Sequence, residues 1–378
     1  MVKKISSLWV TGFAIFVVTA LVIIASWTII IDPFFHYHKP NINKYFYILS
    51  NQRSQNYGIV KHFDYQGIIT GTSMTENFKT SEAEQLWGGT FIKIPFWGAS
   101  FKEINDSLAV ALKYNSEISV IIRSLDMTNF IQDKDAMRLE LGSYPTYLYD
   151  ESLFNDVYYI FNRDVLFSRI YPMIRDKHKS DFHGGITSFD QYSNWMKRNY
   201  KFGKKSLYPK GIFPAKKGAP VYLSEQDRST VLDNVRQNVT ALAQMYPDVI
   251  FYCFFPPYSA KYWQDLVENG KIYRQIQAEK ITIEEVLKYK NIKLFSFNNL
   301  TNITTNLNNY RHETHYGEWI NSLILKCMYS GKCLLTEDNY EEYLAEELRF
   351  YTTFDYAQMD KQEDYEDDYH VASLIITP

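Results

Sequence analysis

Short apolar runs alternate with longer segments of helical periodicity along most of this chain. The runs are bounded by Gly, Pro or polar residues and predict five buried strands, at 65–70, 91–96, 118–125, 248–255 and 292–296. Apolar residues at helical spacing predict helices at 101–114, 223–246, 260–289 and 317–329. Strands that are apolar throughout and separated by helices are typical of a parallel sheet covered on both faces. The pattern therefore predicts an α/β three-layer sandwich.

The N-terminal pattern differs, because residues 8–31 contain no charged side chain. A helix of this length spans about 36 Å, enough to cross the ~30 Å hydrocarbon core of a bilayer. Lys3 and Lys4 precede it, so the positive-inside rule predicts a cytoplasmic tail at 1–7 and an extracellular remainder. The sequence SWTIIIDPFF offers no small-x-small cleavage site, which favours an uncleaved signal anchor over a signal peptide.

The pattern also predicts how the extracellular part is divided. A juxtamembrane segment at 32–64 precedes an α/β domain at 65–334, and the strand–helix alternation is lost between about 129 and 221. This aromatic-rich insertion could be a lid, a polymer-binding surface, or a subdomain that shields an edge of the sheet. From position 336 onward there are thirteen acidic residues and only two basic ones, Arg349 and Lys361, which predicts an acidic tail at 335–378.

Composition restricts the partners. The net charge of −3 and the pI near 6.3 argue against nucleic acid. The aromatic content of 17% suits work near a bilayer or on polymeric sugars. Only three Cys are present, too few for a disulfide scaffold. Outside the cytoplasm Cys327 and Cys333 could form a small-loop disulfide around Gly331, or all three cysteines could be unpaired thiols.

Candidate chemistry begins at Gly71-Thr72-Ser73, directly after the first predicted strand. A Ser here would lie at the carboxyl end of a strand, where open α/β sheets place their active sites. Ser73 could be a nucleophile, with the N–H of Ser73 or Met74 stabilising an oxyanion. The alternative is structural, because Ser73 and Glu76 also fit the S-x-x-E capping box of an ordinary helix start.

A second polar loop, containing His312, Glu313 and His315, comes just before the last predicted core helix. Either His could be brought to the edge of the sheet that carries Ser73 and act as its general base. The alternative is a surface loop with incidental His residues. A metal site is not expected, because zinc-binding His pairs on helices use i, i+4 spacing and this pair is i, i+3. No diffusible cofactor is implied.

Together GTSMTENF after a strand, FWGAS after the second strand and THYGEWIN before the last helix resemble the SGNH (GDSL-like) hydrolase superfamily. The resemblance is greatest to its membrane-anchored extracellular members, such as the proteins of teichoic-acid D-alanylation and alginate O-acetylation. It implies a flavodoxin-like fold over most of 65–329, with Ser73 as nucleophile, Gly98 as an oxyanion-hole donor and His315 as the catalytic base.

The sequence departs from that family in two blocks. The Asn that often donates to the oxyanion has no clean counterpart in RSLDMTNF, where Asp126 and Asn129 are the nearest residues. The family's Asp-x-x-His becomes His312-x-x-His315, so the carboxylate that orients the base is missing. Glu313, Asp126 or a backbone carbonyl could serve instead. Otherwise the enzyme works with a Ser–His dyad, is weakened, or is inactive.

The resemblance implies a membrane-anchored extracellular serine esterase or O-acyltransferase that acts on acyl groups of a cell-envelope glycan through an acyl-enzyme. The expected partners are the bilayer, a cell-envelope polysaccharide or teichoic acid, and a membrane-bound O-acyltransferase. The missing carboxylate motivates a second hypothesis. In that case the chain is a catalytically inactive binding or scaffold partner of such an acyltransferase.

Overall fold

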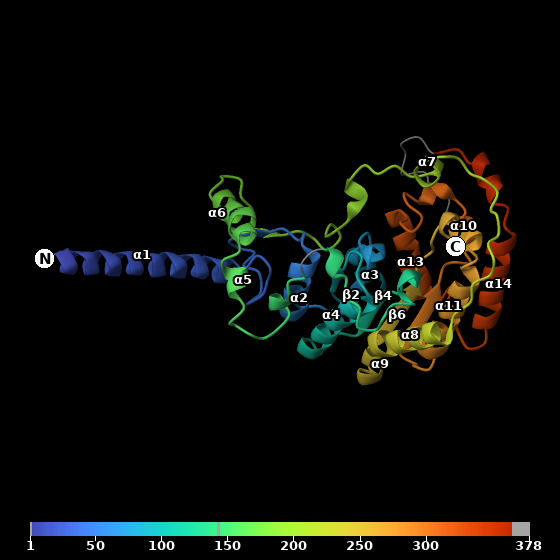
Figure 1. The fold of residues 1–378 in the computed structure, drawn as a ribbon, viewed down its shortest axis with the longest axis horizontal. Helices are drawn as coiled ribbons and strands as arrows, with labels where there is room; N and C mark the ends of the chain where they lie inside the picture. Colours follow the sequence, from blue (N-terminus) through green and yellow to red (C-terminus); the bar gives the residue numbers. More distant parts are fainter. Residues whose placement is uncertain (1, 142–143, 365–378) are drawn as a thin grey trace. The chain divides into compact units, whose positions relative to one another are not determined.

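The computed structural model describes residues 2–141 and 144–364. The chain forms two compact units (Figure 1). Unit 1 comprises Met1–Phe63 and Gly142–Ser188, and unit 2 comprises Asp64–Leu141 and Phe189–Pro378. Each unit is therefore built from two separate stretches of sequence, and each is described by itself below.

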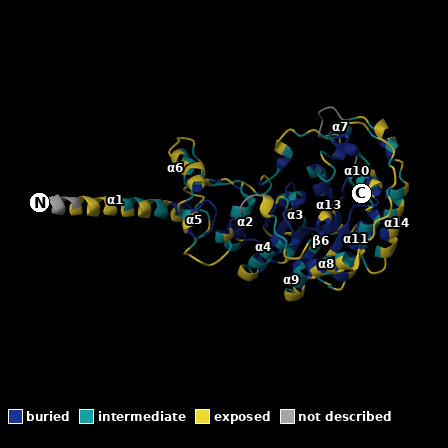
Figure 2. Ribbon diagram, in the orientation of Figure 1, coloured by how far each residue is buried: buried dark blue, intermediate teal, exposed yellow. Residues whose placement is uncertain are grey.

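Unit 2 is built on a five-stranded sheet in which every neighbouring pair is parallel, in the order β3-β2-β4-β6-β7. These strands are β2 (Gly67–Gly71), β3 (Phe91–Pro95), β4 (Val120–Ser124), β6 (Ile250–Phe255) and β7 (Ile292–Ser296). All five predicted strands are present. Most of their residues are buried, as Figure 2 shows, because helices cover both faces of a parallel sheet. The predicted α/β sandwich is thus confirmed.

The helices of unit 2 form two packed groups. In one, α3 (Thr80–Trp87) packs on α13 (Glu318–Ser330). The other contains α4 (Phe101–Tyr114), α8 (Glu225–Val235) and α11 (Ile272–Val286). A π-helical turn, Arg236–Thr240, joins α8 to α9 (Ala241–Met245) and packs on α4 and α11, while α8 packs directly on α11. The remaining helices are α7 (Lys204–Leu207), α10 (Ala260–Glu268), α12 (Thr301–Thr304) and α14 (Tyr340–Thr353).

The predicted helix at 260–289 is two helices, α10 and α11. The break falls at Gly270, whose φ of +66° belongs to the left-handed region that a glycine adopts without strain. The backbone of Ala219 also lies where a Cβ at this position would be. The helix therefore ends because the loop at 218–221 packs against the turn, a long-range contact that periodicity does not reveal.

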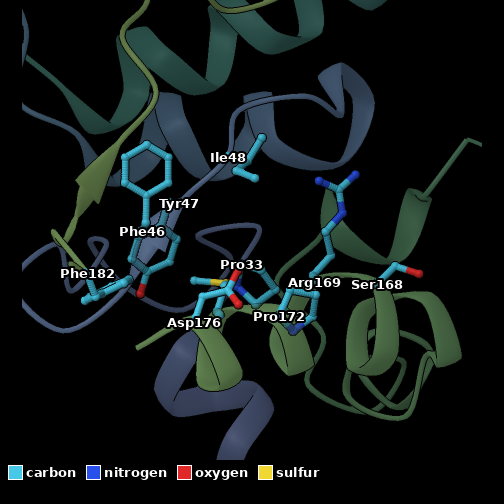
Figure 3. Close-up of a pocket in the computed structure, with 10 residues that line it drawn as sticks. Pro33, Phe46, Tyr47, Ile48, Ser168, Arg169, Pro172, Asp176 and Phe182 are labelled. Atoms are coloured by element: carbon cyan, nitrogen blue, oxygen red, sulfur yellow. The ribbon is translucent and has the colours of Figure 1, made fainter. Parts of the chain in front are cut away.

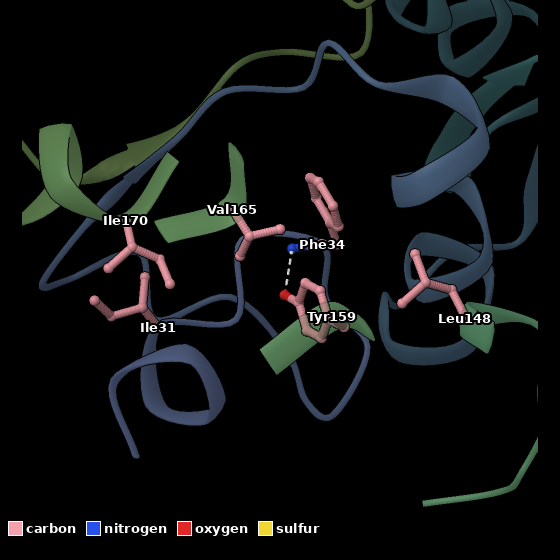
Figure 4. Close-up of a cluster of buried hydrophobic side chains, with 6 residues drawn as sticks. All are labelled: Ile31, Phe34, Leu148, Tyr159, Val165 and Ile170. Atoms are coloured by element: carbon pink, nitrogen blue, oxygen red, sulfur yellow. Dashed lines mark hydrogen bonds between the residues drawn. The ribbon is translucent and has the colours of Figure 1, made fainter. Parts of the chain in front are cut away.

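Unit 1 joins the apolar helix α1 (Val2–Ile31) to a small aromatic core. Its other elements are β1 (Phe46–Tyr47), α2 (Gln52–His62), α5 (Val157–Ile160), α6 (Tyr171–Asp176) and β5 (Gly185–Ile186), with β1 and β5 paired in parallel. Figure 4 shows the core, in which Tyr159 stacks on Phe34 and accepts a hydrogen bond from its backbone N–H at 3.2 Å. The same hydroxyl donates to the buried carboxylate of Asp32.

The two units do not follow the predicted domain limits. The juxtamembrane segment at 32–64 is largely folded within unit 1, and its Phe35 side chain is fully buried there. Residues 142–188 of the predicted insertion belong to the same unit, because β5 and the Tyr159 region pack against that segment. Only the remainder of the insertion belongs to unit 2.

The acidic segment at 335–378 is not a tail as far as the structure describes it. Its helix α14 packs on α10 and α11 and buries Tyr343, Leu344, Glu347 and Tyr351 along one face. The ring of Tyr351 stacks on Trp263 with centroids 4.4 Å apart. Residues 365–378 lie outside the described part of the chain.

A pair of buried carboxyl groups lies where α11 meets α14. Glu279 and Glu347 are both fully buried, and each oxygen of Glu347 lacks a hydrogen-bond partner within the described residues. Burial raises the pKa of both groups, and the charge of Glu279 raises that of Glu347 further. At least one of the two must therefore carry a proton for α14 to stay packed at neutral pH.

We expect the free energy of unfolding to fall as the pH rises from about 5 to 8. A carboxyl whose pKa is raised on folding contributes fully to the stability of the folded state below its unfolded pKa of about 4.5. That contribution is lost as the pH rises through its folded pKa. Glu347→Gln should remove much of this pH dependence, because it should raise the free energy of unfolding at pH 8 by on the order of 1–3 kcal/mol relative to wild type. Urea unfolding at both pH values measures it, with the exposed neighbour Glu346→Gln as control. Equal pH dependence in E347Q and wild type would contradict this account.

Candidate active site

The carboxyl ends of β2 and β4 form the edge of the sheet at which the candidate residues gather. The chain leaves β2 toward β3 on one side and returns to β4 on the other. Open α/β sheets bind their ligands at such a switch point. The loops after the two strands are joined there, because the hydroxyl of Thr72 donates to Asp126 at 2.9 Å.

Ser73 begins a 3-10 turn, Ser73–Thr75, directly after β2. The turn is capped by Thr72, whose hydroxyl accepts from the N–H of Met74 at 3.4 Å. The capping box predicted as the alternative role of Ser73 is therefore wrong, since the residue before it is the cap. Gly71 is required at the strand end, because a Cβ there would lie 2.1 Å from the Ser124 hydroxyl. The Ser73 hydroxyl is left for another partner.

That partner is His315, which approaches from a loop 242 residues later in the chain. The loop is closed by an antiparallel bridge between Tyr310 and Tyr316 and by a hydrogen bond from Arg311 N to the His315 carbonyl at 3.1 Å. His315 Nε2 lies 2.9 Å from Ser73 Oγ. Ser73 and His315 thus form the hydrogen-bonded pair that a nucleophile and its base require.

The other ring nitrogen of His315 has an unexpected partner. Its Nδ1 lies 3.1 Å from the hydroxyl of Thr314, a residue that sequence reasoning did not single out. Among the described residues, the ring bonds only to Thr314 and Ser73, so none of the candidate orienting side chains, His312, Glu313 and Asp126, hydrogen-bonds to it. His312 is exposed and meets it ring to ring at 5.7 Å, while the Glu313 backbone carbonyl accepts from Ser259. The imidazole is therefore oriented by a hydroxyl and not by a carboxylate.

Burial and charge both disfavour protonated His315. Desolvation, followed by the charges of Arg311 and His312, lowers the pKa of His315 to about 3. The imidazole is neutral at physiological pH and can accept the Ser73 proton. It is, however, a weaker base than an ordinary histidine, and no described carboxylate bonds to it to stabilise an imidazolium.

Asp126 supports the serine side of the site. Its buried carboxylate accepts hydrogen bonds from the hydroxyls of Thr72, Ser124 and Tyr258, at 2.9, 2.8 and 3.0 Å. Burial raises its pKa. It therefore joins the ends of β2, β4 and β6 beside Ser73, rather than orienting the His315 ring.

The three candidate oxyanion donors have different surroundings. Gly98 follows β3 with φ of +63°, and its loop is joined to Gly71 by a 2.8 Å bond from Phe96 N. Asn129 donates its amide to the Ala99 carbonyl at 2.9 Å, so it holds this loop in place. The N–H of Met74 donates a long hydrogen bond of 3.4 Å to the Thr72 hydroxyl.

The segment from Phe189 onward contributes residues that sequence reasoning did not single out as site residues. Asp190 accepts from the N–H and hydroxyl of Ser81 at the start of α3. The buried Lys93 ammonium donates to the carbonyls of Glu76 and Phe78 at 2.6 and 2.8 Å, and burial lowers its pKa to about 7. The segment then brings Trp195 to within 6.2 Å of the His315 ring.

Two other features lie apart from the dyad. Cys327 and Cys333 are free thiols, so of the two alternatives the structure has the unpaired thiols and not the disulfide. Unit 1 contains a cavity of about 120 Å³, lined by residues that include Phe46, Arg169 and Phe182 (Figure 3). Within the described residues, no cluster of His, Cys, Asp or Glu is arranged to hold a metal ion.

Comparisons with known proteins add little to these observations. No family profile and no curated protein matches the chain. One solved structure is similar, that of a Streptococcus pneumonia protein given the provisional name of platelet activating factor. The similarity has 10% identity and a TM-score of 0.37, over 78% of this chain and 91% of that one. At that TM-score the likeness carries no argument, so the site must be interpreted from its own residues.

The depressed pKa of His315 predicts an unusual pH dependence for the reactivity of Ser73. An ordinary imidazole, with a pKa near 6.5, would lose about thirtyfold of its neutral form between pH 7.5 and pH 5. With a pKa of about 3 the base stays neutral across this range. The rate of labelling by a fluorophosphonate should then change less than about twofold. A loss near thirtyfold would show that the imidazole titrates normally.

Proposed function

We propose that this chain is a membrane-anchored serine esterase or O-acyltransferase of SGNH type, acting on acyl groups of a cell-envelope glycan. The observation that carries the proposal is the 2.9 Å contact between Ser73 Oγ and His315 Nε2 at the carboxyl edge of a parallel sheet. The apolar stretch Ser7–Ile31 of α1 supports the envelope location, and the aromatic content of 17% supports a polymeric substrate.

The reaction follows from this geometry. His315 Nε2 takes the hydroxyl proton as Ser73 Oγ attacks the acyl carbonyl, and the backbone N–H groups of Ser73 and Gly98 are the proposed donors to the oxyanion. The imidazolium returns the proton to the departing alcohol, which leaves an acyl group on Ser73. Water or a glycan hydroxyl then attacks that ester and gives its proton to His315. The bond between the acyl carbon and Ser73 Oγ breaks, and the imidazolium returns the proton to Oγ, which regenerates the free serine and the neutral base.

A fluorophosphonate probe tests this activity directly. The full-length protein in detergent should be labelled, and Ser73→Ala should abolish labelling because the attacked atom is gone. His315→Ala should slow it by about 10³-fold or more, since the hydroxyl then has no base. Ser116→Ala, which removes an exposed hydroxyl in unit 2, is the matched control and should label like wild type.

The second candidate function rests on the Thr314 contact, since His315 lacks a carboxylate partner among the described residues. A dyad without that partner could have lost its activity and kept its fold. The chain would then bind a glycan or a membrane-bound acyltransferase without chemistry. A folded wild type that no fluorophosphonate labels would favour this role and reject the enzymatic one.

We further propose that α1 anchors the protein and that part of unit 1 contacts the bilayer. The helix has an apolar stretch, Ser7–Ile31, with a mean hydropathy of 2.7. The hydroxyl of Thr28 donates to the Ile160 carbonyl at 3.0 Å, so the end of α5 lies beside the last turn of α1. Nearby in sequence, Phe154 is 94% exposed and Phe167 is 67% exposed. If α1 spans the membrane, these side chains meet the headgroup region of the leaflet.

Fluorescence measures this contact in the full chain reconstituted into lipid nanodiscs. An environment-sensitive dye on Phe154→Cys, in a Cys333→Ser background, should emit at shorter wavelength and be quenched by lipids spin-labelled near the headgroup. The same dye on Met245→Cys is the control, because Met245 is similarly exposed but belongs to unit 2. Water-like emission from position 154 would reject the bilayer contact, and blue-shifted emission without lipid quenching would favour a protein partner instead.

A further inference from the structure

Arg311 lies against two aromatic rings beside the candidate dyad. Its guanidinium carbon is 4.0 Å from the ring centre of Trp195 and 4.1 Å from that of Tyr200. The two rings are 5.7 Å apart and nearly perpendicular to each other, so they contact the guanidinium from different sides and restrict its orientation. The arginine is therefore held in one orientation before any ligand arrives.

The charge of this arginine is not balanced by a carboxylate within the described residues. Some arginines of unit 2 are paired with a carboxylate, as Arg274 is with Asp227 at 2.9 Å and Arg236 is with Glu285 at 3.3 Å. The Nε of Arg311 is buried and has no hydrogen-bond partner. The same is true of Arg123, but it is Arg311 whose backbone bonds to His315 of the dyad. A buried donor on a charged group is costly to leave unsatisfied, so the geometry favours an acceptor supplied from outside the chain.

The position of Arg311 makes its charge matter for the dyad. Its backbone N–H donates to the His315 carbonyl at 3.1 Å, and the Trp195 ring lies 6.2 Å from the imidazole. The acyl-transfer reaction creates an imidazolium at His315, next to a guanidinium and without a carboxylate. Two neighbouring cations repel each other, and an anion between or beside them would offset that repulsion.

We propose that Arg311 binds an anionic group of the substrate, a phosphate or a carboxylate next to the ester that Ser73 attacks. The substrate then supplies the negative charge that the chain lacks while His315 is protonated. This inference rests on the proposed function and narrows its substrate to an acylated polymer with an anionic group close to the acyl ester. A planar guanidinium suits either anion, because both accept two parallel hydrogen bonds from it.

Binding of small anions to the full-length protein in detergent tests the subsite without turnover. We expect calorimetry to detect methyl phosphate, glucuronate or both with wild type, and the stronger of the two identifies the anion. Arg311→Gln should weaken that binding by about tenfold to a hundredfold. Arg349→Gln, an exposed arginine elsewhere in unit 2, is the control and should bind like wild type. The proposal is overturned if neither anion binds, or if R311Q binds as well as wild type does.

Kinetics separate a binding role from a structural one. Arg311→Gln should lower kcat/KM for an ester that carries a phosphate, and should raise the pKa of His315 seen in the pH–rate profile of p-nitrophenyl acetate. The pKa rises because the mutation removes the charge of Arg311, which lowers the pKa of His315. The other neighbouring charges are unchanged, since His312 remains and Glu318 stays paired with Lys79. Equal losses on both esters without a pKa change would reject the subsite.

A second variant covers the case in which R311Q does not fold. Arg311→Lys keeps the charge, so it should retain measurable anion binding, weaker than wild type because the two-pronged hydrogen bonding is lost. Loss of all anion binding in folded R311K would contradict the charge-based account. These results are independent of the fluorophosphonate test. Failure of labelling with intact anion binding would reject the enzyme and keep the site.

Discussion

The hydrogen bond between Ser73 and His315 depends on the parallel order of five strands. Two residues 242 positions apart meet only because the loop after β2 and the loop before α13 open at the same edge of the sheet. The turn at Ser73 is in turn joined to α13, whose Asn321 amide donates to the Met74 carbonyl at 3.1 Å. Any change that moves α13 along the sheet therefore moves the base away from the hydroxyl.

The buried carboxylate of the site serves the hydroxyl side rather than the imidazole side. Asp126 accepts three hydroxyl hydrogen bonds and holds the loop that presents Ser73. A carboxylate paired with the base would raise the pKa of the histidine, whereas His315 is surrounded by Thr314, Arg311 and His312. The two halves of the site are thus unequal, with a firmly positioned Ser73 hydroxyl and an imidazole that is kept neutral.

The sequence was sufficient to predict the sheet and the dyad but not the long-range packing around them. The five strands were recognisable because each is a run of apolar residues that ends at Gly, Pro or polar residues. The capping role was misassigned because Thr72 and Ser73 are both good N-cap residues, one position apart. Unit 1 was missed because it depends on a pairing of only two residues per strand, β1 with β5. Arg311 was missed because nothing in its local sequence indicates that Trp195 and Tyr200 contact it.

The charge arrangement has a consequence for selectivity under the proposed subsite. A pocket that merely binds an anion lowers the energy of substrate and transition state equally, which does not speed the chemical step. Here the anion interacts more strongly once His315 is protonated, because the site then holds two cations instead of one. The benefit falls on the transition state, so esters without the anion react slowly even when they reach Ser73. Selection would then operate in the proton transfer itself, and the missing carboxylate would be a means of discrimination rather than a defect.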